Sequence, residues 1–94
     1  MLYLVHMQVN IPQSMPRDEA DKLKADEKAY SQQLQQSGKW RHLWRVAGQY
    51  ANYSVFDVAS NDELHQTLMG LPLYPYMAIT VTPLAQHPSA IAAN

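Results

Sequence analysis

The 94-residue chain contains no cysteine, which excludes a disulfide framework, a thiolate zinc site, an iron–sulfur cluster and a thiol nucleophile. Charged residues are scarce at 16%, and seven basic against eight acidic side chains leave a net charge of -1. This balance provides no general positive field for nucleic acid or for an anionic membrane. The chain also lacks a basic signal-peptide region and any apolar run that approaches the roughly 18 residues of a membrane-spanning helix. We therefore expect a cytoplasmic protein that binds neither nucleic acid nor membrane.

Apolar side chains, by contrast, are abundant for so short a chain. Hydrophobic residues make up 47%, and they include six tyrosines, five methionines and two tryptophans. A domain of this size has a high ratio of surface to volume and should show mostly polar surface. We therefore expect a single domain over residues 1–94 whose excess apolar surface faces a pocket or other copies of the chain.

Six segments carry the periodicity of secondary structure. Alternating or β-branched residues predict strands over 2–10, 39–47, 50–58 and 76–82. Helix-forming residues over 16–36, with Pro16 in the first turn and Gly38 at the end, predict a long helix. Ser60 and Glu63 form a capping box that opens a short helix ending before Pro72. We expect residues 83–94 to form an extended C-terminal arm.

The resulting order is βαββαβ, which is typical of the ferredoxin-like α+β fold. It predicts a four-stranded antiparallel sheet with both helices on one face. On the first strand the residues Tyr3, Val5, Met7 and Val9 would face the helices, and on the last strand Met77, Ile79 and Val81 would do so. The opposite face is also apolar, and such a face is usually covered by another subunit.

A carboxylate interrupts the apolar stripe of the long helix. The stripe has the spacing +3, +4, +3, +4 and consists of Ala20, Leu23, Glu27, Tyr30 and Leu34. Glu27 should therefore point at the sheet or its margin, where desolvation would raise its pKa toward that of a general base working near neutral pH. Alternatively, Glu27 lies at the edge of the stripe and reaches water, or pairs with Lys24 or Arg41.

Strict alternation over residues 39–47 would place Trp40, His42, Trp44 and Val46 on one face, with Arg41, Leu43 and Arg45 on the other. Interleaved aromatic and basic residues occur in RNA-binding sheets, but the aromatic–glycine signature of that module is absent. The favoured interpretation is that the tryptophans pack in a subunit interface, while Arg41 or Arg45 pairs with an acid or binds an anionic ligand.

Three uncharged polar side chains share one face of the next strand, namely Tyr50, Asn52 and Ser54. Such a row can orient a polar ligand or bind a developing oxyanion, or it can satisfy turn and edge groups. The four histidines stand singly at positions 6, 42, 65 and 87, without the spacing of metal ligands, so we expect no metal site. No Gly-x-Ser-x-Gly motif or glycine-rich phosphate loop is present.

Several longer strings occur together in a specific order. They are Leu23–Lys28 (LKADEK), Trp40–Arg45 (WRHLWR), Tyr50–Val58 (YANYSVFDV), Leu71–Met77 (LPLYPYM) and His87–Ser89 (HPS). In order and spacing the chain resembles the muconolactone Δ-isomerase family from Met1 to Ile91. The related chloromuconolactone dehalogenases share the same scaffold.

This resemblance implies a ferredoxin-like subunit that assembles into a homodecamer, with active-site pockets near subunit boundaries. It implies a cofactor-independent reaction of the β-ketoadipate pathway of aromatic degradation, in which (+)-muconolactone becomes 3-oxoadipate enol-lactone. The reaction is a 1,3-proton shift: a base removes the proton from C4, and the resulting dienolate is protonated at C2. A chloromuconolactone dehalogenase and a non-catalytic oligomeric binding protein for aromatic acids are the alternatives.

The same resemblance implies roles for individual residues. Glu27 fits the base that accepts and returns the proton, and Tyr50 and Asn52, with Ser54 beside them, fit donors toward the lactone. Arg41 fits the partner of the substrate carboxylate, with Lys24 and His6 as secondary candidates. Trp40 and Tyr76 could close an apolar wall around the lactone.

Overall fold

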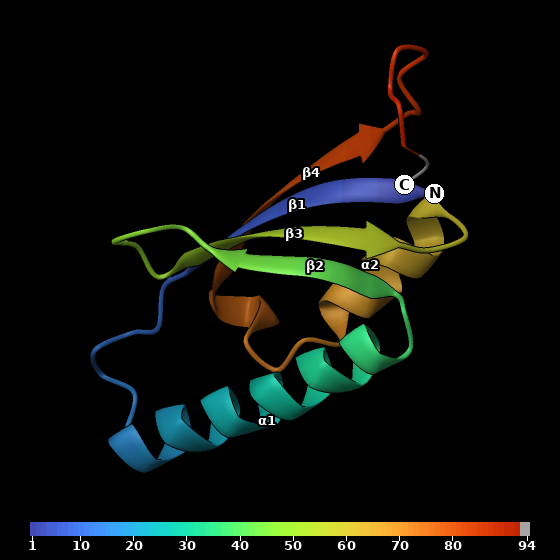
Figure 1. Ribbon diagram of the computed structural model, residues 1–94. Coiled ribbons are helices and arrows are strands. Elements are labelled where there is room, and N and C mark those ends of the chain that lie inside the picture. The colour runs from blue at the N-terminus through green and yellow to red at the C-terminus, as the bar shows by residue number, and fades with distance from the viewer. Residues whose placement is uncertain (93–94) are drawn as a thin grey trace.

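The computed structural model describes residues 1–92 and shows a four-stranded sheet with two helices on one side (Figure 1). In chain order the elements are β1 (Leu2–Val9), α1 (Arg17–Gln36), β2 (Trp40–Arg45), β3 (Ala51–Asp57), α2 (Asn61–Met69), a 3-10 turn η1 (Tyr74–Tyr76) and β4 (Met77–Leu84). The strand order is β2-β3-β1-β4, and every neighbouring pair is antiparallel. The predicted α+β fold and the βαββαβ order are confirmed.

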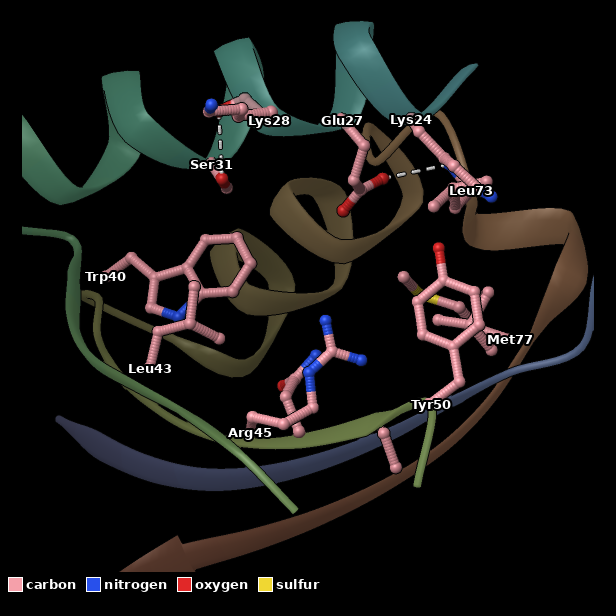
Figure 2. A pocket seen from close by; sticks show the side chains of 13 residues that line it. Lys24, Glu27, Lys28, Ser31, Trp40, Leu43, Arg45, Tyr50, Leu73 and Met77 are labelled. Atoms are coloured by element: carbon pink, nitrogen blue, oxygen red, sulfur yellow. Dashed lines mark hydrogen bonds between the residues drawn. The ribbon is translucent and has the colours of Figure 1, made fainter. Parts of the chain in front are cut away.

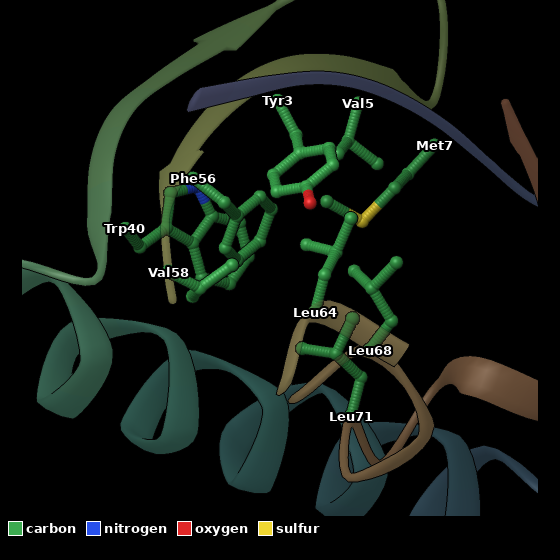
Figure 3. Close-up of a cluster of buried hydrophobic side chains, with 9 residues drawn as sticks. All are labelled: Tyr3, Val5, Met7, Trp40, Phe56, Val58, Leu64, Leu68 and Leu71. Atoms are coloured by element: carbon green, nitrogen blue, oxygen red, sulfur yellow. The ribbon is translucent and has the colours of Figure 1, made fainter. Parts of the chain in front are cut away.

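The inner face of the sheet, which faces the helices, carries the predicted register. Along β1 the side chains alternate between half-buried and buried, and Tyr3, Val5, Met7 and Val9 are the buried set. Tyr3, Val5 and Met7 pack with residues of β2, β3 and α2 in one core, drawn in Figure 3. The core members contributed by other elements are Trp40, Phe56, Val58, Leu64, Leu68 and Leu71.

Helix α2 begins as the sequence indicates, and α1 begins one residue later than expected, at Arg17. The hydroxyl of Ser60 accepts a hydrogen bond from the Glu63 N–H at 3.1 Å and caps α2. Pro16 stands at the N-cap of α1, one residue before the first helical position. The five residues of the predicted stripe on α1 are all half-buried. The one buried residue of this helix is Ser31, which follows the stripe residue Tyr30. None of the helices is long and apolar enough, within residues 1–92, to cross a membrane.

The last strand differs from the expected range of 76–82. Tyr76 belongs to the 3-10 turn η1, and β4 continues to Leu84, so Pro83 lies inside the strand instead of opening the arm. Pro83 pairs with Tyr3 in register. A proline is tolerated there because β4 is an edge strand, where a missing N–H need not interrupt the ladder. The arm therefore begins at residue 85, and residues 93–94 of the predicted arm lie outside the described residues.

A β-bulge corrects the predicted alternation of β2. Trp40 pairs with Phe56 and His42 pairs with Val55, so Arg41 is an extra residue without a partner of its own. Because an extra residue reverses the side-chain alternation, Trp40 does not share a face with His42 and Trp44. The Trp40 ring is 2% exposed and packs on Phe56, whereas Trp44 is 57% exposed and stacks on His42.

Candidate active site

A cavity of about 320 Å³ lies between α1 and the inner face of the sheet (Figure 2). Its lining comes from α1, from the β2–β3 hairpin and from the start of β4. The lining residues are Val9, Lys24, Glu27, Lys28, Ser31, Trp40, Leu43, Arg45, Tyr50, Ala51, Asn52, Leu73 and Met77. Five of the residues proposed from the sequence, Lys24, Glu27, Trp40, Tyr50 and Asn52, are therefore brought together here.

Glu27 projects from the middle of α1 into this cavity. Its Oε1 accepts a hydrogen bond from the Leu73 N–H at 2.9 Å, which orients the carboxylate. Burial raises the pKa of Glu27 above the ordinary value of 4.5, and the Leu73 hydrogen bond opposes part of that rise. The negative charge of Glu27 also contributes, after burial, to a raised pKa at Tyr30 one turn further along. Glu27 is thus a fixed carboxylate with enhanced basicity.

The cavity collects basic side chains that the protein does not neutralise. Four of the seven basic residues form ion pairs: Arg17–Asp21, Lys22–Asp26, Lys39–Glu63 and Arg41–Asp57. The other three, Lys24, Lys28 and Arg45, have no acidic partner within the described part of the chain, and all three line the cavity. Against them stands the single carboxylate of Glu27. The cavity therefore favours an anionic ligand.

Tyr50 lies between two of these cations. The Lys24 ammonium is 5.9 Å from the centroid of the Tyr50 ring, and the Arg45 guanidinium carbon is 5.2 Å from it. Both separations are within the range of cation–π attraction. Figure 2 shows the Tyr50 hydroxyl directed toward the end of the cavity where Glu27 and Leu73 lie. Tyr50 can therefore donate to a ligand that also contacts Glu27.

Asn52 is oriented by its neighbour on β3. The fully buried Ser54 hydroxyl donates to Asn52 Oδ1 at 2.7 Å. This bond holds the Asn52 side chain in one orientation, and its amide group retains two N–H donors that could serve a ligand in the cavity that Asn52 lines. Ser54 itself does not line the cavity, so it positions Asn52 and does not reach the ligand space.

The remaining walls are mostly apolar, formed by Trp40, Leu43, Leu73 and Met77. The indole Nε1 of Trp40 is the one buried side-chain nitrogen or oxygen, within residues 1–92, that has no hydrogen-bond partner. Trp40 thus presents an apolar surface to the cavity, and it packs inside the single chain instead of in the subunit interface that the sequence favoured for both tryptophans.

Three other residues proposed from the sequence lie elsewhere. Arg41 sits in the bulge and its guanidinium faces Asp57 Oδ2 at 3.5 Å, outside the cavity. His6 is on the outer face of the sheet, where its ring lies 4.8 Å from that of Tyr53. Tyr76, in η1, does not line the cavity, and its carbonyl accepts a hydrogen bond from the Asn10 N–H.

Sequence reasoning missed Leu73, Ser31 and Lys28, and it named Arg41 instead of Arg45 as the partner of the substrate carboxylate. The Leu73 contribution is a backbone N–H, which no residue type signals. Ser31 and Lys28 stand four and one residues after Glu27, and the helical spacing of four was the available signal for Ser31. For Arg45 the signal was absent, because a bulge cannot be seen in the alternation of side chains.

The arrangement is suited to moving a proton in an anionic, partly apolar ligand. It provides one oriented base, two side-chain donors and a surplus of positive charge in a concave site. No group of three or more histidine, aspartate and glutamate side chains capable of holding a metal ion occurs in residues 1–92.

Comparison with known proteins agrees with this chemistry. The family model described as muconolactone delta-isomerase matches residues 1–90. The muconolactone delta-isomerase of Cupriavidus pinatubonensis is 67% identical over 97% of this chain and 99% of its own, and that of Pseudomonas aeruginosa is 53% identical over 100% and 98%.

Solved structures give the same result. A crystal structure of muconolactone isomerase superposes with a TM-score of 0.95 at 57% identity, over 100% of this chain and 98% of the other. A 5-chloro-2-hydroxyhydroquinone dehydrochlorinase from Burkholderia phenoliruptrix shares the fold alone, with a TM-score of 0.61 at 20% identity over 93% and 96% of the two chains. The agreement of the family model, the curated relatives and the solved structure over nearly the whole length shows that this chain belongs to the muconolactone delta-isomerase family.

Proposed function

We propose that the cavity is the active site of a cofactor-independent isomerase that converts (+)-muconolactone to 3-oxoadipate enol-lactone. The observation that carries the proposal is the pairing of an oriented carboxylate, Glu27, with three unneutralised cations in one concave site. The substrate has the matching chemistry, because it combines a proton made acidic by conjugation with a carboxylate arm.

In this mechanism the Glu27 carboxylate removes the proton from C4 of the lactone. The electron pair of the broken C–H bond forms the C3–C4 double bond, and the electrons of the former C2–C3 double bond form a C1–C2 double bond. The π electrons of the C1 carbonyl move onto its oxygen, so the dienolate carries its negative charge on the lactone carbonyl oxygen. The protonated Glu27 then returns the proton to C2. Burial supports both steps, because a raised pKa makes the carboxylate a stronger base and keeps the acid competent to return its proton near neutral pH.

Tyr50 and Asn52 stabilise the dienolate in this proposal. Tyr50 and Asn52 line the same cavity as Glu27, and the Ser54 hydrogen bond fixes the orientation of the Asn52 amide. Donors that are already oriented when charge develops lower the barrier without reorganising during the reaction.

Glu27→Gln tests the base directly. The variant keeps an oxygen that can accept from the Leu73 N–H, so the fold and the cavity should persist. We expect kcat to fall by about 100- to 10,000-fold, the range typical of general-base catalysis. Turnover is followed by the ultraviolet absorbance of muconolactone without added cofactor, and near-normal turnover by this variant would place the base elsewhere.

The same assay separates the alternative functions. Chloride release from 5-chloromuconolactone with a higher kcat/KM than isomerisation of muconolactone would favour a dehalogenase. Ligand binding without turnover of either lactone would leave a binding protein.

We further propose that the chain assembles with itself, as a homodecamer, through the outer face of the sheet. Thr80, His6, Tyr53 and Trp44 are aligned in register across all four strands and form one row on that face. Tyr53 on the central strand β3 and Trp44 on the edge strand β2 are 46% and 57% exposed in the single chain, and together they form an exposed aromatic patch of the kind that marks a contact with another chain.

Sedimentation velocity at micromolar concentration tests the assembly. A species of about ten subunits is expected, and Trp44→Asp should reduce its size because a desolvated carboxylate is costly in an apolar contact. A monomeric wild-type protein would contradict this proposal without bearing on the chemistry of Glu27.

A further inference from the structure

We propose that Arg45 binds the carboxylate of the substrate and sets the preference of this site for lactones that carry a carboxylate arm. The inference rests on the proposed function of the cavity and assigns the recognition step to a single side chain. The sequence left both Arg41 and Arg45 open as binders of an anionic ligand, and the family resemblance favoured Arg41 for the substrate carboxylate; the structure places Arg45, and not Arg41, in the cavity.

The β-bulge decides which arginine can reach the ligand. Arg41 is the extra residue of the bulge, and its guanidinium is engaged with the carboxylate of Asp57. After the bulge, Leu43 and Arg45 face the helix side of the sheet with Trp40, and all three line the cavity. Two arginines four residues apart on one strand are thereby assigned different partners.

Figure 2 shows the guanidinium group of Arg45 extending into the cavity between the rings of Trp40 and Tyr50, across the cavity from Glu27. The guanidinium carbon of Arg45 is 5.2 Å from the centroid of the Tyr50 ring. Its one hydrogen bond is a long contact of 3.5 Å from Nη1 to the Gln49 carbonyl oxygen. Cation–π attraction to Tyr50 therefore helps to hold the fork of N–H donors in place, while most of its hydrogen-bonding capacity remains available.

The positions of Arg45 and Glu27 on opposite sides of the cavity also suit the two groups of the substrate that must be bound, its carboxylate arm and its C4 proton. A guanidinium fork binds a carboxylate through two parallel hydrogen bonds, which fixes direction as well as charge. With the arm of the lactone held at Arg45, the ring and its C4 proton extend toward Glu27. Lys24 and Lys28 on α1 add positive charge, but a single ammonium group cannot provide that two-point geometry.

The test uses two inert ligands that differ in one charge: a saturated γ-lactone with a carboxymethyl arm, and its methyl ester. Wild-type protein should bind the acid more tightly than the ester. In Arg45→Gln the ratio of the two dissociation constants should fall by about 10- to 100-fold, the effect expected for hydrogen bonds to a charged group. Affinity for the ester should change little.

Arg41→Gln is the matched control, since it removes an arginine from the same strand but outside the cavity, and it should leave the ratio unchanged. Arg45→Lys should recover part of the preference for the acid. In turnover, Arg45→Gln should raise KM for muconolactone more than it lowers kcat, because the carboxylate interaction is made equally in the ground state and the transition state.

Equal losses of acid and ester affinity in Arg45→Gln, an equal effect of Arg41→Gln, or no binding of the acid to wild-type protein would each overturn the inference. Because the ligands are inert, these binding measurements do not depend on whether Glu27 is the catalytic base. If Glu27→Gln retains turnover while Arg45→Gln loses the preference for the acid, the base assignment fails and the carboxylate assignment stands.

Discussion

The two helices cover the same face of one sheet, yet they do opposite things with the space beneath them. Helix α2 places Leu64 and Leu68, followed by Leu71, against β1 and β3, and this half of the interior is filled. Helix α1 presents Glu27, Ser31 and Lys28 to the sheet, and the space beneath it remains a cavity of about 320 Å³. Leucine at each turn removes water from the interface, whereas a carboxylate and a small hydroxyl keep a volume open for a ligand.

The cavity exists because the side chains that α1 directs toward the sheet do not fill the interior beneath this helix. Helix α1 contributes the buried Ser31 and the half-buried Tyr30 and Leu34 to the interior, whereas the fully packed core comes from the sheet and from the α2 half. We therefore expect the stability of the subunit to rest mainly on the α2 half and on the sheet. The following predictions test that division, beginning with the largest expected effect.

The strongest test compares a leucine from each helix. Leu68→Ala should lower the free energy of unfolding by about 2–5 kcal/mol, because Leu68 is buried in the filled half and its loss leaves a void. Leu23→Ala, on the half-buried stripe of α1, should cost only about 1 kcal/mol, since less apolar area returns to water. Urea unfolding at equal protomer concentration measures both, and equal losses would break the comparison.

Gly70→Ala tests the contact between Tyr30 of α1 and the end of α2. A Cβ at Gly70 would overlap the hydroxyl of Tyr30, which donates to the Thr67 carbonyl at 2.8 Å and joins α1 to the end of α2. The substitution should cost about 1–3 kcal/mol through overpacking. Since φ at Gly70 is −75°, an ordinary helical value, the cost arises from the contact and not from the backbone. In a Tyr30→Phe background the penalty should shrink, and an unchanged penalty would exclude this explanation.

Ser31→Leu should convert part of the cavity into packed core. The new side chain would bury apolar area and change stability by no more than about 1 kcal/mol in the favourable direction. By occupying ligand volume, it should weaken binding of the carboxymethyl lactone by about tenfold or more. Ser31→Ala is the control, because it removes only a hydroxyl bonded to the Lys28 carbonyl within the helix. Retained affinity in Ser31→Leu would show that ligands bind elsewhere.

The smallest effect concerns the pH dependence of stability. Because the pKa of Glu27 is raised in the folded state, the folded protein holds this proton more tightly than the unfolded chain does. Its contribution to stability is therefore greatest below the ordinary value of 4.5 and declines as pH rises from there through the raised pKa. Glu27→Gln lacks this decline, so its stability relative to wild type should increase across that window, as measured by urea unfolding at several pH values.

Activity should follow the same group in the opposite direction. Because the base must be ionised, kcat/KM for muconolactone should rise with pH through a midpoint above 4.5. A midpoint at or below 4.5 would show that the environment of Glu27 does not have the desolvation that the α1 half of the molecule implies.

Much of the architecture could be predicted because it depends on local periodicity. The alternation of Tyr3, Val5 and Met7 on β1 and the +3/+4 stripe of α1 both follow from the geometry of a single element, and both are confirmed. The placement of Glu27 on the inner side of α1 followed from the same rule. The capping interaction of Ser60 is also local, since it involves residues three apart.

The errors arose where two segments meet. The end of β4 moved to Leu84 because pairing with β1 extends it past Pro83, and the faces of β2 changed because one extra residue opposes β3. Neither fact can be obtained from one strand, since register is a property of a pair.

The amino-acid order by itself determined the elements, the inward sides of β1 and α1, and the presence of a carboxylate where packing favours an apolar residue. Only the tertiary structure decided that Leu73 orients that carboxylate and that Arg45, instead of Arg41, shares its cavity. The physical reason is that periodicity sets the direction of a side chain about its own backbone. Which groups face one another depends on strand register, on bulges and on contacts between residues far apart in the chain.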